Sequence, residues 1–162
     1  IKDDDIFVLT DADEVINAKS LQWLRENAKN GVVYQAKLKW HLYSPCFIHR
    51  HPTTVNVAVT IYTLRTQFQW RANLVRSSNP NIVVIPDRAG IHCSWCFFTP
   101  SQFRKKMRDS HDGENVGLYK TDAQKWTDKR IMEFMKNGLW LDGVPHGKNM
   151  CLFRAAHRQI FL

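Results

Sequence analysis

Three carboxylates, Asp11, Asp13 and Glu14, lie within four residues of each other near the start of the chain. The apolar run before them, residues 6–9, has the composition of a buried strand. In an extended segment, side chains two residues apart share a face, so Asp11 and Asp13 can direct their oxygens toward one point. Such carboxylates repel each other unless a cation lies between them, and Mg²⁺ or Mn²⁺ is bound in this way together with ligand phosphates. We predict a divalent-metal site at the carboxyl end of this strand, where open α/β sheets collect ligands; the alternative is a solvated acidic turn.

A second candidate ligand is His92, near the start of a later apolar strand and two residues after Gly90. Gly90 permits a close approach of the backbone, and Ser94 repeats on the same face as His92. Neutral imidazole suits Mn²⁺, so we predict that His92 faces the acidic motif as a metal or diphosphate ligand. The competing interpretation is a structural histidine that is hydrogen-bonded within the sheet.

The four cysteines are Cys46, Cys93, Cys96 and Cys151. The spacing of Cys93 and Cys96 is that of half a zinc or redox motif, but a second Cys-x-x-Cys pair is missing. Alternation along residues 91–98 places the two on opposite faces of a strand, so we predict that they share neither a disulfide nor a metal. Buried structural cysteines are favoured, and the sequence leaves disulfide connectivity open.

Composition is that of a soluble globular protein, with 162 residues, 44% hydrophobic and 23% charged. A net charge of +8 is compatible with a nucleic-acid partner, but only residues 104–108 form a basic cluster. We expect no nucleic-acid partner, because anionic substrates such as nucleotide diphosphates suit this surface equally well. The chain has no signal-peptide pattern and no apolar stretch of bilayer length. It begins without an initiator Met and runs directly into an expected core strand, so we expect it to be part of a longer protein.

The hydrophobic pattern predicts strands and helices of a mixed α/β domain. The expected strands are residues 6–9, 32–42, 55–61, 82–85 and 91–98. The expected helices follow the N-caps Asn17, Thr99 and Thr127, and end at Gly31, near residues 110–115 and at Gly138. Gln102 completes a capping box with Thr99. Residues 45–52 and 70–81 are expected to form loops.

Four segments, in the same order, resemble glycosyltransferase family 17. They are Thr-Asp-Ala-Asp-Glu-Val at 10–15, Gly-Ile-His-Cys-Ser-Trp-Cys-Phe at 90–97, Lys-Met followed by Ser-His at 106–111, and Gly-Leu-Trp-Leu-Asp-Gly at 138–143. The resemblance implies a GT-A-like mixed sheet with flanking helices. It also implies inverting transfer of N-acetylglucosamine from UDP-GlcNAc to a mannose of an N-glycan on a glycoprotein. GT-A domains place nucleoside-binding strands before the Asp-x-Asp motif, so residues 1–162 would be the C-terminal part of a larger catalytic domain.

The resemblance further implies the Golgi lumen, as part of a type II membrane protein whose anchor lies upstream. A divalent ion held by Asp11 and Asp13 would neutralise the departing diphosphate. Single-displacement inversion needs one general base to take the proton of the acceptor hydroxyl. We predict Glu114 as this base, with His111 orienting it or binding substrate. The competitors for the role are Asp112 and Asp142, and a solvated Glu114 past a helix end is the structural alternative.

Two other classes of function fit parts of the sequence. An apolar strand followed by Asp11 and Asp13 also matches the nucleophile motif of haloacid-dehalogenase-type phosphohydrolases, with Asp11 attacking phosphorus and Asp13 as acid and base. That mechanism needs a late acidic pair for Mg²⁺, and no convincing Gly-Asp-x-x-x-Asp-like segment follows Ile82. The third class is a non-catalytic basic binding module, for which retention on a polyanion would be sensitive to salt and independent of metal.

Overall fold

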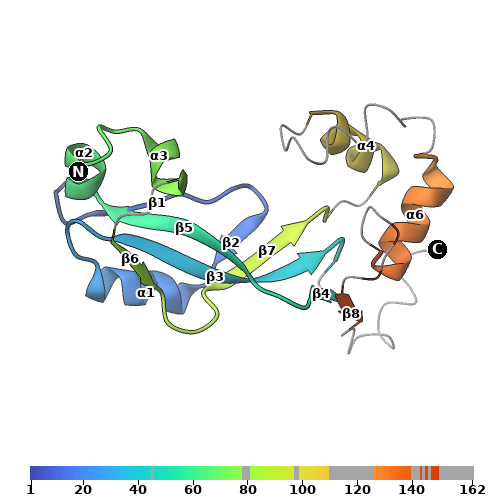
Figure 1. Cartoon of the computed structure of the whole chain (residues 1–162), viewed down its shortest axis with the longest axis horizontal. Helices are drawn as coiled ribbons and strands as arrows, with labels where there is room; N and C mark the ends of the chain where they lie inside the picture. Colours follow the sequence, from blue (N-terminus) through green and yellow to red (C-terminus); the bar gives the residue numbers. More distant parts are fainter. Residues whose placement is uncertain are drawn as a thin grey trace. The chain divides into compact units, whose positions relative to one another are not determined.

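The chain divides into two compact units, which are described separately. Unit 1 comprises residues 1–40 and 51–92, and unit 2 comprises residues 41–50 and 93–162. The computed structural model (Figure 1) describes residues 1–44, 46–77, 81–96, 99–109, 126–139, 143, 145 and 147–149.

A mixed sheet forms the centre of unit 1. Its strands are β1 (Ile6–Val8), β2 (Glu14–Ile16), β3 (Val33–Leu42), β5 (Thr53–Thr60), β6 (Ile82–Val84) and β7 (Gly90–Ser94). The strand β5 lies antiparallel between β1 and β3, and β6 pairs parallel with β3. The short strand β2 pairs antiparallel with β7, which also pairs with β3. The mixed α/β fold predicted from the sequence is therefore confirmed.

Helices cover both faces of this sheet, as Figure 1 shows: α1 (Ala18–Asn27) lies on one side, and α2 (Ile61–Thr66) and α3 (Ala72–Ser77) lie on the other. On the α1 face, Leu24 packs in a cluster with Tyr34 and other strand residues. On the opposite face, Val75 of α3 packs with Val33 and with residues of α2. Burying a side chain such as Leu24 or Val75 contributes about 2 kcal/mol, so each helix is held mainly by its apolar side.

Two expectations for unit 1 need correction, the burial of its first strand and the end of its first helix, while the predicted N-cap of that helix is confirmed. The strand β1 is only partly buried, because it pairs on one side alone and Val8 is exposed. Asn17 caps α1 as predicted, accepting a hydrogen bond from the amide of Ser20 at 2.8 Å. The helix ends at Asn27, where Ala28 is extended, and Gly31, with a φ of +77°, lies in the turn before β3.

The segment between β5 and β6 contains two helices that the sequence did not predict. Ile61, which was expected to end a strand, begins α2 after the N-cap Thr60. The predicted loop at 70–81 contains α3. Both helices have only six residues, too few to show a clear period of 3.6, and they depend on packing against the sheet.

In the part of unit 2 that the structure describes, two short strands pair antiparallel and two helices are present. These elements are β4 (Phe47–His49), β8 (Gly147–Asn149), α4 (Pro100–Asp109) and α6 (Asp128–Asn137). The strand β4 falls in a predicted loop; it pairs with β8 and, at a single position, with the end of β3. An aromatic cluster joins the helices, with ring-centroid distances of 4.8 Å from Trp95 to Phe103, 5.9 Å from Phe103 to Trp126 and 5.4 Å from Trp126 to Phe134.

Both helices of unit 2 begin as predicted. The hydroxyl of Thr99 accepts the amide hydrogen of Gln102, and the Gln102 side chain accepts that of Thr99, which completes the capping box. Thr127 caps α6, and Gly138 ends it with a φ of +64°. Within the ranges that the structure describes, no helix is long and apolar enough to cross a membrane.

Candidate active site

The acidic motif forms a tight turn between β1 and β2, entirely within unit 1. The amide of Glu14 donates to the carbonyl oxygen of Asp11 at 3.0 Å. In return, the amide of Asp11 donates to Oε2 of Glu14, also at 3.0 Å. Two hydrogen bonds between Asp11 and Glu14 therefore close this segment into a turn. The extended conformation expected for Asp11 and Asp13 is wrong. The turn follows the carboxyl end of β1, where the site was predicted.

Glu14 is the buried member of the three carboxylates, with a side chain that is 3% exposed. Its partner is Arg76 of α3, whose Nη2 lies 2.6 Å from Oε2 and whose Nη1 lies 3.5 Å from Oε1. The same Nη2 lies 3.4 Å from Oδ1 of Asp11. The guanidinium of Arg76 therefore contacts the carboxylates of both Glu14 and Asp11, and it partly offsets the negative charge of the motif. The sequence offered no signal for Arg76, because the residue lies in a predicted loop.

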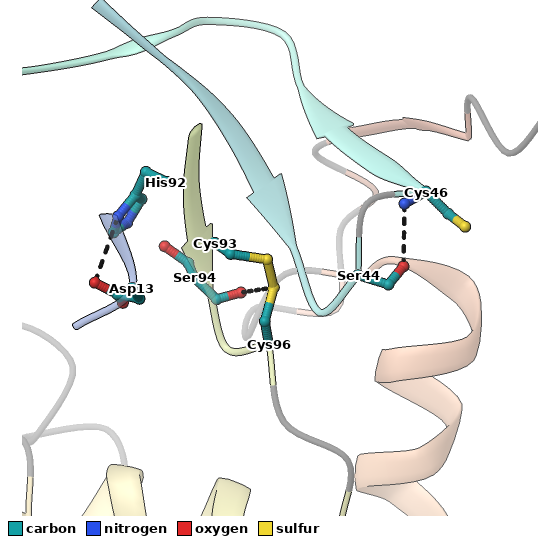
Figure 2. The surroundings of a disulfide bond; sticks show 7 residues. All are labelled: Asp13, Ser44, Cys46, His92, Cys93, Ser94 and Cys96. Atoms are coloured by element: carbon teal, nitrogen blue, oxygen red, sulfur yellow. Dashed lines mark hydrogen bonds and ion pairs between the residues drawn. A yellow bond between two sulfur atoms is a disulfide. The ribbon is translucent and has the colours of Figure 1, made fainter. Parts of the chain in front are cut away.

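His92 lies beside the acidic motif. The register of β2 and β7 pairs Glu14 with His92, which brings Nδ1 of His92 to 3.6 Å from Oδ1 of Asp13 (Figure 2). The rings of Trp40 and His92 are tilted, with centroids 6.1 Å apart. Gly90 makes this pairing possible, since a Cβ there would lie 2.0 Å from the carbonyl oxygen of Val15. The structure thus places His92 near Asp13, and its role as a ligand stays a prediction.

The two aspartates offer oxygen ligands of the kind that hard divalent cations prefer. Asp11 has a side chain that is 71% exposed, and Asp13 is partly exposed. Over the described part of the chain, no three or more His, Cys, Asp or Glu side chains are grouped so that they could hold a metal ion by themselves. A cation here would depend on phosphate oxygens and water for the rest of its shell, as Mg²⁺ usually does. Asp11 and Asp13 therefore supply oxygen atoms of the right type for such a site, and metal binding there stays a prediction.

The prediction that Cys93 and Cys96 do not pair with each other is wrong, because a disulfide joins them (Figure 2). The strand β7 ends at Ser94, and Trp95 adopts a left-handed φ of +61°. This turn interrupts the alternation on which the prediction depended and brings the two Cα atoms to 5.5 Å. Cys46 is also disulfide-bonded.

The predicted general base Glu114 and its companion His111 lie outside the described residues, as do the competitors Asp112 and Asp142. The structure therefore assigns no base.

Comparison with known proteins gives the family. No curated protein and no solved structure matches the chain. The sequence model of glycosyltransferase family 17 matches residues 1–139, which include the acidic turn, Arg76, His92 and every described helix. That range covers most of the chain and confirms the resemblance drawn from the four segments. The chain belongs to glycosyltransferase family 17.

Proposed function

We propose that this chain carries part of the catalytic site of an inverting N-acetylglucosaminyltransferase, which moves N-acetylglucosamine from UDP-GlcNAc to a mannose of an N-glycan. Family membership supports glycosyl transfer and gives no support to a phosphohydrolase. The observation that carries the proposal is the acidic turn. Its buried carboxylate, Glu14, is neutralised by Arg76, whereas Asp11 and Asp13 keep exposed surface for a ligand.

We propose Asp11 and Asp13 as ligands of Mn²⁺ or Mg²⁺, with His92 as a third candidate ligand. Two ligand atoms at about 2.1 Å from one ion, at right angles, are about 3 Å apart. The 3.6 Å between His92 and Asp13 is close to that separation, so a small adjustment would let this pair contact one ion, whereas binding by all three side chains would need a rearrangement of the turn. When bound, such an ion neutralises charge that develops on the diphosphate leaving group.

The transfer itself is a single displacement. The acceptor hydroxyl oxygen bonds to the anomeric carbon, the bond from that carbon to the diphosphate oxygen breaks, and UDP leaves with the bonding electrons. A general base takes the hydroxyl proton, and Glu114, oriented by His111, remains our candidate for it.

The location that we propose is the Golgi lumen, in a protein anchored by a membrane segment upstream of this chain. Disulfides persist in oxidising compartments and are rare in the cytosol. The Cys93–Cys96 bond and the bonded Cys46 are consistent with a luminal location.

The test is an assay of the full-length protein with UDP-GlcNAc, an N-glycan acceptor and Mn²⁺. We expect transfer that a chelator abolishes, and an Asp13→Asn enzyme with activity reduced about 100-fold, the order expected for loss of a key electrostatic interaction. The matched control is Arg65→Gln, which removes a charge from an exposed pair with Asp3 in the same unit and should leave activity unchanged. Full activity of Asp13→Asn would contradict the proposed metal site. Release of phosphate from a monoester, without sugar transfer, would favour the phosphohydrolase.

A further inference from the structure

We propose that Glu14 and Arg76 are positioning residues: their buried ion pair fixes the turn that presents Asp11 and Asp13, while Glu14 itself stays out of ligand binding. The consequence for catalysis rests on the proposed function, but the geometry does not. From spacing alone Glu14 would count as a third carboxylate of the motif.

The oxygens of Glu14 are already engaged. Oε2 accepts from both Nη2 of Arg76 and the amide of Asp11, while Oε1 faces Nη1 of Arg76. With the side chain almost completely buried, a cation could reach Glu14 only if these contacts broke. Because one of them is the amide of Asp11, moving Glu14 would also release the turn.

Arg76 is in turn fixed from the sheet. Nδ2 of the buried Asn56 on β5 donates to the carbonyl oxygens of Val75 at 3.1 Å and Arg76 at 3.4 Å. Oδ1 of Asn56 accepts from Nε2 of Gln35 on β3, at 3.2 Å. These contacts attach the end of α3 to the strands β5 and β3. The backbone of Arg76 is therefore held in place while its guanidinium contacts the turn.

The contact of Arg76 with Asp11 predicts how charge changes will act. If Glu14 becomes neutral, Asp11 is the stronger remaining partner for the guanidinium, and Arg76 will compete with a cation for it. If Arg76 becomes neutral, Glu14 is buried without a counter-charge, and the turn must open or rearrange. If both become neutral, neither penalty remains, and an amide pair can keep the hydrogen bond to the Asp11 amide.

The experiment is a double-mutant cycle in the full-length protein with Glu14→Gln, Arg76→Gln and the double variant. Mn²⁺ affinity is measured by titration, at a temperature where circular dichroism shows every variant folded. We expect Mn²⁺ binding to weaken about 10-fold in each single variant and to stay within about 3-fold of wild type in the double variant. Arg76→Lys, which keeps the charge but loses the fork, should fall between Arg76→Gln and wild type. Arg65→Gln is the control, because it breaks an exposed ion pair of similar length.

Folded single variants with the Mn²⁺ affinity of wild type would overturn the proposal, and so would a double variant whose loss is the product of the two single losses. Hydrogen exchange of the peptide that covers residues 9–14, measured without metal, separates this proposal from the proposed function. If wild type binds no Mn²⁺, the metal site fails, and exchange alone decides on positioning. Faster exchange in both single variants supports the role of the ion pair, and unchanged exchange refutes it.

Discussion

Gly90→Ala should disturb the site without altering any side chain in it. Gly90 lies opposite Ile16 at the start of the β2–β7 pairing. A Cβ at this position would lie 2.0 Å from the carbonyl oxygen of Val15 and 2.9 Å from its carbonyl carbon. These are backbone atoms, so a side-chain rotation cannot relieve the clash. The strands must move apart by about 1 Å to reach 3.0 Å, below which Cβ contacts are essentially never seen.

The cost can be worked from that displacement. Overpacking that forces backbone shifts costs about 1–3 kcal/mol, and a clash with backbone belongs at the upper end, so we expect about 3 kcal/mol. For a chain of this length, each kcal/mol lowers the melting temperature by about 2–4 °C, which gives a fall of about 6–12 °C. The same movement shifts His92 relative to Glu14 and Asp13, so transferase activity should also fall at temperatures where the variant is folded.

Thermal unfolding followed by circular dichroism measures the first effect, and sugar transfer measures the second. The control is Gly31→Ala, also in unit 1. Its φ of +77° costs an alanine about 1–2 kcal/mol, but its nearest neighbour, Nε2 of Gln67, is 3.5 Å away. We expect that variant to be moderately destabilised and fully active. A shift in melting temperature of less than about 2 °C corresponds to a loss of less than about 1 kcal/mol. A Gly90→Ala protein with so small a shift would refute the steric argument.

Two further predictions concern unit 2. Replacing Cys93 and Cys96 by serine should cost about 2 kcal/mol in urea unfolding, because the disulfide closes a loop of only four residues. The control is a reducing agent, which should destabilise wild type more than the double-serine variant. If both proteins lose the same stability on reduction, the Cys93–Cys96 bond does not stabilise the fold. Phe103→Ala, in the centre of the aromatic cluster, should cost about 4 kcal/mol, and an unchanged unfolding midpoint would contradict the packing described for α4 and α6.

The helices of unit 2 were predictable because the signals that begin and end them are local. Thr99 and Gln102 satisfy each other across one turn, and Thr127 satisfies the first turn of α6. Gly138 supplies the left-handed residue that ends the helix. No distant part of the chain is needed for these contacts, so sequence spacing was sufficient.

The short helix α3 was not predictable for the opposite reason. Six residues are too few for a helix that is stable by its own propensity, and its sequence lacks a capping signal that we recognised. What holds it is distant in sequence: Val75 is buried on the sheet, and Asn56 binds its last carbonyls. Because α3 was missed, Arg76 was missed as well.

The Cys93–Cys96 bond was mispredicted because the alternation of a strand was extended beyond the end of that strand. Alternation described β7 correctly up to Ser94, but it was continued through Trp95 as though the strand did not end. A left-handed conformation is uncommon for any residue other than glycine, so nothing in the sequence marked Trp95 as the turning point. One backbone angle changed the disulfide prediction without changing the strand that carries His92.

The spacing of the acidic residues was enough to predict where the candidate site lies, but not which carboxylate is buried and paired. That distinction depends on a residue far away in the sequence. Two like charges 4 Å apart repel by about 4 kcal/mol in surroundings of intermediate polarity, so three carboxylates in one turn need a positive partner. Arg76 is that partner for Glu14, and it lies 62 residues away in the sequence. Nη2 of Arg76 also lies 3.4 Å from Oδ1 of Asp11, where it offsets part of the charge of Asp11 and leaves most of that side chain exposed. A motif balanced in this way has a permanent counter-charge for its buried acid, while its exposed acids stay available for the cation that we propose.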